Sequence, residues 1–183
     1  RYLTVNRFVD ERRDPIKASE AAAKLLKHNY ERLGNWPMAV TAYNHGTAGM
    51  LRAKDAMGGY EAVFESYNGP LFKFASRNFY SEFLAARHVA KNHTQYFSDV
   101  RLNRTQEARE VVTKGPASIA ELSRRYEVDL DTLRTLNPAL GQAVFKGQRQ
   151  VPKGTMLRLP ADSAKGIKVS STAIPQTHPD LRQ

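Results

Sequence analysis

Apolar residues recur at helical spacing along the first half of this 183-residue chain. The clearest run begins at Asp14-Pro15, where an acidic cap and a first-turn proline suit a helix start. It stops at Gly34, a residue that tolerates the left-handed conformation of a helix end. Its apolar positions are Ala18, Ala21, Ala22, Leu25, Leu26, Tyr30 and Leu33. The small alanines predict close packing of this helix against a neighbouring one.

Further helical segments follow, separated by Gly, Asn and Pro. We expect helices over about 35–43, 48–57 and 76–91, with a short amphipathic piece at 60–67. The apolar face of the last helix is expected to carry Phe79, Phe83, Ala86, Val89 and Ala90. Residues 1–97 therefore predict an all-α domain.

The pattern changes after a polar stretch at 98–108, which we interpret as a linker. The elements expected beyond it are a strand at 110–113, a helix capped by Ser118, a helix capped by Asp129 or Asp131, and a strand at 155–159. This order predicts a small βααβ module over 109–160. Residues 161–183 are rich in Ser, Thr, Pro and Lys and lack periodicity, so we expect an extended tail.

The composition limits the classes of function. The chain has no Cys, which excludes disulfides, thiolate metal sites and Cys nucleophiles. Its five His residues show no H-x-x-x-H or H-E-x-x-H spacing, so we predict no metal site and no cofactor. No apolar run approaches the roughly 18 residues of a membrane-spanning helix.

The net charge of +10 favours a polyanionic partner. Nucleic acid, an anionic membrane face and a carboxylate-rich cell wall all fit a basic chain. The basic residues are scattered, however, and form no stripe interleaved with aromatic residues. We therefore predict no specific nucleic-acid partner.

Several motifs occur together in the order found in one enzyme family. Residues 42–46, Ala-Tyr-Asn-His-Gly, resemble the A-Y-N-x-G motif of the lysozyme-like lytic transglycosylases, glycoside hydrolase family 23. Residues 8–15 and the Ala-rich helix after them resemble its V-D-x-R-x-D-P stretch. Asn35-Trp36 is similar to the D-W that precedes A-Y-N, with Asn in place of Asp. Arg77-Asn78-Phe79-Tyr80 resembles the closing-helix motif T-R-x-Y-V.

The second half resembles a LysM module over residues 118–160. Asn137-Pro138 matches the module's pattern, whereas Lys114-Gly115-Pro116-Ala117 stands where a G-D-T turn is typical. The resemblance implies a lysozyme-like helical domain, incomplete at its N-terminus, followed by a LysM-like module that either binds glycan or serves as a spacer.

The resemblance to the transglycosylases implies cleavage of the β-1,4 bond between N-acetylmuramic acid and N-acetylglucosamine, giving 1,6-anhydro ends. One Glu serves as both acid and base in that family. Its E-S motif precedes the part matched here, so we expect no catalytic residue in this segment. The catalytic Glu should lie on a preceding segment of the same protein, about 25 residues before Arg1. Glu65-Ser66 comes after A-Y-N-x-G and reads as a surface helix pair, and Glu11 as a structural ion-pair partner.

The candidate substrate-binding residues are Tyr43, Asn44, His45, Gly46, Phe79 and Tyr80. Asn44 can donate to and accept from an N-acetyl group, but it can also cap the next helix. His45 is either a substrate contact or an exposed turn residue, and the two rings at 79 and 80 could be core aromatics. The candidate glycan-binding residues of the second module are Lys114, Gly115, Asn137 and Pro138.

Two other functions compete with the transglycosylase. A goose-type lysozyme would hydrolyse the same bond with water as acceptor, and a non-catalytic module would bind the wall without cutting it. A basic nucleic-acid binder is a third, weaker alternative. The resemblance implies peptidoglycan strands as partner and a periplasmic or secreted, wall-associated location, with anchoring through a preceding segment left open.

Overall fold

The computed structural model describes residues 2–101 and 107–163. The chain divides into two compact units, and each is described by itself. Unit 1 contains residues 1–2 and 16–103, and unit 2 contains residues 3–15 and 104–183. The expected tail beyond residue 163 lies outside the described residues, as do residues 102–106 of the expected linker. The strand after that linker already begins at Ala108.

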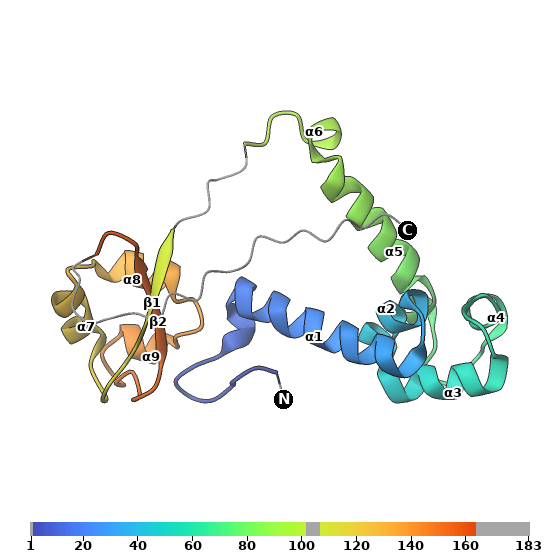
Figure 1. The fold of residues 1–183 in the computed structure, drawn as a ribbon, viewed down its shortest axis with the longest axis horizontal. Helices are drawn as coiled ribbons and strands as arrows, with labels where there is room; N and C mark the ends of the chain where they lie inside the picture. The colour runs from blue at the N-terminus through green and yellow to red at the C-terminus, as the bar shows by residue number, and fades with distance from the viewer. Residues whose placement is uncertain (1, 102–106, 164–183) are drawn as a thin grey trace. The chain divides into compact units, whose positions relative to one another are not determined.

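Unit 1 is built from helices, in agreement with the predicted mainly helical fold (Figure 1). They are α1 (Pro15–Leu33), α2 (Trp36–His45), α3 (Thr47–Met57), α4 (Tyr60–Ser66), α5 (Phe74–Lys91) and α6 (His93–Tyr96). Helix α2 packs against both α3 and α5, and α3 packs against α4. The packing of α2 against α5 places the end of α2 next to the start of α5.

Local chemistry sets the ends of α2. The Asn35 side chain accepts a hydrogen bond from the Met38 N–H and caps the start of the helix. Gly46 ends it with φ of 84°, a backbone conformation that favours glycine. The same glycine opens α3, so the two helices join without an intervening loop.

The core of unit 1 is an apolar cluster, and one buried amide beside it hydrogen-bonds two neighbouring helices. The buried cluster contains Leu33, Met38, Ala42, Met50, Ala53, Val63 and Phe72. Asn29 of α1 is fully buried beside it. Its Nδ2 donates to Ala39 O at 3.2 Å, and its Oδ1 accepts from Thr47 Oγ1 at 2.6 Å. One side chain therefore links α1, α2 and α3.

Helix α5 departs from the expected burial of its apolar face. It starts two residues before the expected position, and its one buried residue is Ser76 in the first turn. Phe83 and Leu84 are 41% and 42% exposed. Helix α5 meets α2 and α6 within unit 1, so most of its length remains open to solvent.

Unit 2 combines a two-stranded antiparallel sheet with short helices (Figure 1). Its elements are β1 (Ala108–Val112), α7 (Ile119–Tyr126), α8 (Leu130–Leu136), α9 (Gln142–Phe145) and β2 (Met156–Pro160). Val111 pairs with Leu157 in the sheet. The expected βααβ order is present, with α9 as an addition between α8 and β2. The predicted Ser118 cap is confirmed, because Ser118 and Glu121 form a reciprocal capping box.

Residues 3–15 belong to unit 2, although the sequence motifs had assigned them to the first domain, 1–97. Val9 forms an antiparallel bridge with Leu140 and packs against the unit 2 core. The buried Asp14 carboxylate lies 2.8 Å from Arg158 of β2. These long-range contacts join the segment before α1 to unit 2, and a short-range pattern does not reveal them.

Candidate functional site

The A-Y-N-H-G residues form the end of α2 and the turn into α3. Tyr43 and Asn44 are exposed on the last turn of α2, and Tyr43 is 47% exposed. His45 is the last residue of the helix and is half-buried. Gly46 redirects the chain into α3. The turn therefore presents a phenol and an amide on the same helix end.

Helix α5 contributes a hydroxyl, that of Ser76, which contacts both Asn44 and His45. Ser76 Oγ donates to Asn44 Oδ1 at 2.9 Å and lies 3.3 Å from His45 Nδ1. Gly46 occupies the N-cap position of α3, so the Asn44 amide oxygen goes to Ser76 and not to the cap. The capping alternative for Asn44 is therefore wrong.

The His45 ring is enclosed by Ser76, Phe72 and Gly49. The Phe72 ring meets it edge-on, with the centroids 5.0 Å apart. Gly49 of α3 lies so close that a Cβ there would be 2.6 Å from His45 Cδ2. Burial and, to a lesser extent, the charge of Arg52 lower the pKa of His45, which favours the neutral ring. The exposed-turn alternative for His45 does not fit this enclosure.

Two aromatic rings contact each other at the end of α2, where Tyr43 directly precedes Asn44. The rings of Tyr43 and Phe79 are nearly parallel, with an interplanar angle of 10° and centroids 6.1 Å apart. Since Phe79 is half-buried and Tyr43 exposed, the pair offers an apolar surface beside Asn44. The structure thus brings together Tyr43, Asn44, His45, Gly46 and, from α5, Phe79.

Tyr80 belongs to a second aromatic group. Its ring meets Tyr60 of α4 edge-on at 5.5 Å, and Tyr60 in turn lies 6.2 Å from Phe64. Burial raises the pKa of the Tyr60 phenol, and the neighbouring Thr41 hydroxyl opposes that shift. Thr41 Oγ1 is buried without a hydrogen bond of normal geometry to any of the described residues.

Sequence reasoning missed three neighbours of the turn: Gly49, Phe72 and Ser76. Ser76 directly precedes Arg77, and the one sequence feature that points to it is a Ser at the start of the expected helix 76–91. Arg77 lies in the segment that resembles the closing-helix motif, and its side chain anchors the loop before α5. Its guanidinium donates to the carbonyls of Phe64 and Tyr67, the latter at 2.7 Å, and its centre lies 5.4 Å from the Phe72 ring centroid.

The carboxylates considered from the sequence lie elsewhere in the fold. Glu65 and Ser66 are exposed in the last turn of α4. Glu11 Oε2 accepts from the Thr4 N–H at 2.6 Å, in the segment that belongs to unit 2. Within residues 2–101 and 107–163, no group of three or more His, Asp or Glu side chains is arranged to hold a metal ion.

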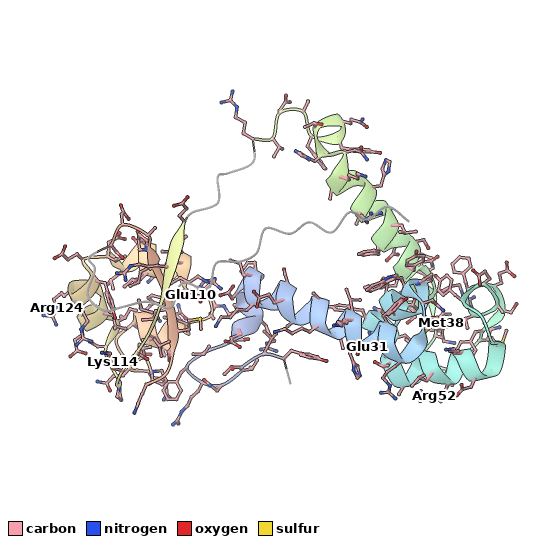
Figure 2. The ribbon with its side chains drawn as sticks, in the orientation of Figure 1. Glu31, Met38, Arg52, Glu110, Lys114 and Arg124 are labelled. Carbon is pink, nitrogen blue, oxygen red and sulfur yellow. The ribbon has the colours of Figure 1, made fainter. Side chains whose placement is uncertain are left out.

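The candidate residues of unit 2 lie in two loops. Lys114 is exposed and Gly115 is half-buried in the loop after β1 (Figure 2). That loop is tied to residues before β2 by the Ala117–Val151 bridge and by Thr113 Oγ1, which donates to Pro152 O at 2.6 Å. Pro138 follows α8 and is half-buried.

Asn137 serves the interior of unit 2. It is 6% exposed, and its Nδ2 donates to Leu133 O at 2.9 Å and to Arg158 O at 2.8 Å. Its Oδ1 accepts from the Arg158 N–H at 2.8 Å. Both amide protons and one oxygen lone pair are thus used to join the end of α8 to β2.

Unit 1 is thus a helical unit that presents an exposed amide and a pair of aromatic rings at the end of α2. Residues 2–62 match the family model described as the Transglycosylase SLT domain. The match supports a lysozyme-like transglycosylase domain and, at a general level, an enzyme whose substrate is peptidoglycan.

The SLT match covers about a third of the chain. It includes the unit 2 segment 3–15, α1, α2 with the A-Y-N-H-G turn, and α3, while α5 and the elements of unit 2 from β1 onwards lie beyond it. No curated protein matches the chain. In the part of the chain that is described, no helix is long and apolar enough to cross a membrane.

Proposed function

We propose that this chain is part of a lytic transglycosylase that cleaves the bond between N-acetylmuramic acid and N-acetylglucosamine and leaves 1,6-anhydro ends. The observation that carries the proposal is the exposed Asn44 amide, held by Ser76 beside the Tyr43 and Phe79 rings, within and next to the region of the SLT match. The same residues suit a sugar that is polar at its edges and apolar on its ring faces.

The chemistry of these side chains defines their roles. The Asn44 amide hydrogen-bonds an acetamido group, and the Tyr43–Phe79 pair packs against a sugar ring. Gly46 ends α2 directly after Asn44 and His45, and the packing of α5 on α2 brings Ser76 to both side chains. Tyr80 extends the aromatic surface towards Tyr60. None of these residues is an acid, so they bind and orient the glycan.

The proton transfer is assigned to a Glu on a segment that precedes Arg1. This carboxylic acid donates its proton to the oxygen of the leaving N-acetylglucosamine as the bond to C1 breaks. The resulting carboxylate then takes the proton of the muramyl 6-hydroxyl while that oxygen bonds to C1. The acid is thereby regenerated, and no water is consumed.

Product mass tests this reaction against the goose-type lysozyme alternative. The natural full-length protein is incubated with purified peptidoglycan, and the released muropeptides are analysed by mass spectrometry. Anhydro ends are lighter than reducing ends by one water. We expect anhydro ends; reducing ends alone would establish a hydrolase.

Replacement of Asn44 tests the binding role. We expect Asn44→Ala to lower the activity of the full-length enzyme about tenfold or more, since it removes a hydrogen bond to substrate. Its melting temperature should stay close to that of the wild type, because Asn44 is exposed and does not cap α3. Glu65→Gln, at the exposed end of α4, is the matched control and should leave activity unchanged.

We propose further that unit 2 is a LysM-like module that holds the enzyme on glycan, an organisation of the membrane-bound lytic murein transglycosylase D type. The support is its element order and the two loops that carry Lys114, Gly115 and Pro138. Asn137 shapes the second loop from inside. Such a protein works at the cell wall, in the periplasm or outside the cell.

Co-sedimentation with purified sacculi tests the module and the non-catalytic alternative together. Lys114→Glu should reduce the bound fraction if the first loop contacts glycan, whereas Arg124→Glu, exposed on α7 (Figure 2), should not. Binding without any released muropeptide from the full-length protein would favour a wall-binding function alone.

A further inference from the structure

The Ser76 hydroxyl joins two side chains of the site and can give only one proton. It donates to Asn44 Oδ1 at 2.9 Å and lies 3.3 Å from His45 Nδ1. A hydroxyl has one O–H and two lone pairs. With its proton directed at Asn44, Ser76 can only accept from His45. The two contacts together therefore require a proton on Nδ1 of the neutral His45 ring, and they leave Nε2 without one.

We propose that Ser76 and His45 are positioning residues that hold the Asn44 amide with its NH2 group turned towards the glycan. The inference rests on the proposed function and deepens it. With Nε2 protonated instead, His45 Nδ1 would accept from Ser76. Asn44 would then have to rotate and donate its NH2 to Ser76, presenting its oxygen outward. The ring nitrogen of His45 that carries the proton thus determines whether Asn44 presents its NH2 group or its oxygen to a ligand.

Packing around His45 favours the observed arrangement. Ser76 is 6% exposed, so water does not compete freely for its hydroxyl. Gly49 leaves room for the ring, since a Cβ there would lie 2.7 Å from His45 Nε2. Phe72 blocks another side with its ring at 90° to the imidazole. The ring thus lies between Gly49 of α3, Phe72 in the loop before α5, and Ser76 of α5.

The orientation of the Asn44 amide affects which glycan the site prefers. An outward NH2 group donates to the carbonyl oxygen of an acetamido group. The ammonium of a de-N-acetylated glucosamine has only donors and needs an acceptor in the protein. The site should therefore prefer N-acetylated glycan, and the preference should depend on Ser76.

The tautomer of His45 gives a direct test that needs no ligand. Long-range ¹H–¹⁵N correlation spectra of the full chain at about pH 8, where imidazole is neutral, distinguish Nδ1–H from Nε2–H. We expect Nδ1–H for His45 in the wild type and in Ser76→Thr, and loss of that preference in Ser76→Ala. His28, exposed on α1, is the internal reference. Nε2–H at His45 in the wild type would overturn the inference.

Gly49→Ala provides a second variant that leaves Ser76 in place. The added Cβ displaces the His45 ring, so we expect the same loss of the Nδ1–H signal. If Ser76→Ala fails to fold, as judged by the dispersion of its amide spectrum, Gly49→Ala tests whether the packing around His45 sets its tautomer. An unchanged Nδ1–H signal in a folded Gly49→Ala protein would contradict the described packing.

Binding of two defined tetrasaccharides tests the substrate preference. Calorimetry with the tetramers of N-acetylglucosamine and of glucosamine should show tighter binding of the first. Ser76→Ala should reduce the ratio of the two affinities about fivefold, the equivalent of one ordinary hydrogen bond, while Ser76→Thr retains it. An unchanged ratio in Ser76→Ala would overturn the positioning role. A wild type with His45 Nδ1–H that binds neither tetramer supports the arrangement of Asn44 and contradicts the proposed function.

Discussion

Asn29 shows how a single polar side chain can organise a helical unit. It is fully buried and hydrogen-bonds Ala39 O of α2 and Thr47 Oγ1 of α3. A buried polar group that loses its partner keeps its desolvation cost without the compensating bond. Loss of the Asn29 amide would remove both bonds, one to each neighbouring helix.

We therefore expect Asn29→Ala to lower the free energy of unfolding by about 2–3 kcal/mol. Urea denaturation of the full chain, followed by far-UV circular dichroism, measures this value. Asn68→Ala is the control, because Asn68 is exposed and bonds only at 3.4 Å to Arg77. It should cost no more than about 0.5 kcal/mol. Equal effects of the two variants would contradict the structural role of Asn29.

The residue scale also shows which residues around the A-Y-N-H-G turn can be selected from the sequence and which cannot. Tyr43, Asn44, His45 and Gly46 could be selected because they are contiguous in one motif. Ser76 could not, because it lies far along the chain and meets Asn44 only when α5 packs on α2. Phe79 was selected from a motif, but its parallel contact with Tyr43 depends on the same packing.

At the scale of elements, the caps of the unit 2 helices illustrate a choice that the sequence left open. Asp129 and Asp131 both precede apolar residues of α8. The structure shows Asp129 at the cap, where its side chain accepts from the Thr132 N–H at 2.8 Å and from Thr132 Oγ1 at 2.6 Å. Asp131 lies in the first turn and pairs with Arg134 at the surface.

Asp129→Ala should lower the melting temperature, whereas Asp131→Ala should change it little. The hydrogen bonds from Thr132 lower the pKa of Asp129. Because this pKa is lower in the folded than in the unfolded chain, the stabilisation is present above about pH 4 and is lost as the pH falls further. Thermal melts at pH 7 and at pH 3 should therefore show a smaller difference between wild type and Asp129→Ala at the lower pH. A larger difference at pH 3 would contradict the assigned cap.

The segment before α1 is an element whose place depends on a buried ion pair. The side chains of Asp14 and Arg158 are 4% and 14% exposed and lie 2.8 Å apart. Glu110 lies 3.5 Å from the same Arg158. Removing Asp14 leaves Arg158 with the more exposed and more distant carboxylate.

We expect Asp14→Ala to destabilise unit 2 by about 3 kcal/mol. Hydrogen exchange should become faster in β1 and β2 and stay unchanged in α2 and α3. Asp10→Ala is the matched control from the same segment, since Asp10 pairs at the surface with the exposed Arg12. Faster exchange in α2 and α3 alone would show that residues 3–15 do not stabilise unit 2.

At the scale of the whole molecule, two separate apolar clusters and a net charge of +10 define the chain. Salt screens the attraction between a basic protein and an anionic polymer. Direct contacts with a neutral sugar are far less sensitive to salt. The two contributions to wall binding can therefore be separated by ionic strength.

We expect co-sedimentation with purified sacculi to decrease severalfold between about 0.05 M and 0.5 M salt, as the Debye length falls well below 10 Å. Binding of the uncharged N-acetylglucosamine tetramer should change little over the same range. Duplex DNA is the control polyanion, and its binding should disappear at the higher salt. DNA binding that persists at 0.5 M would favour a nucleic-acid partner.

The amino-acid sequence by itself determined the largely helical character of residues 15–91, the helix end at Gly34, and the capped helix at Ser118. These features depend on spacing, turn residues and caps within a few positions of one another. Tertiary structure alone decided that Asn137 bonds inside unit 2, that Asp14 pairs with Arg158, and that Ser76 holds both Asn44 and His45. Each of these contacts joins residues at least 20 positions apart, and such contacts exist only after helices and strands have packed.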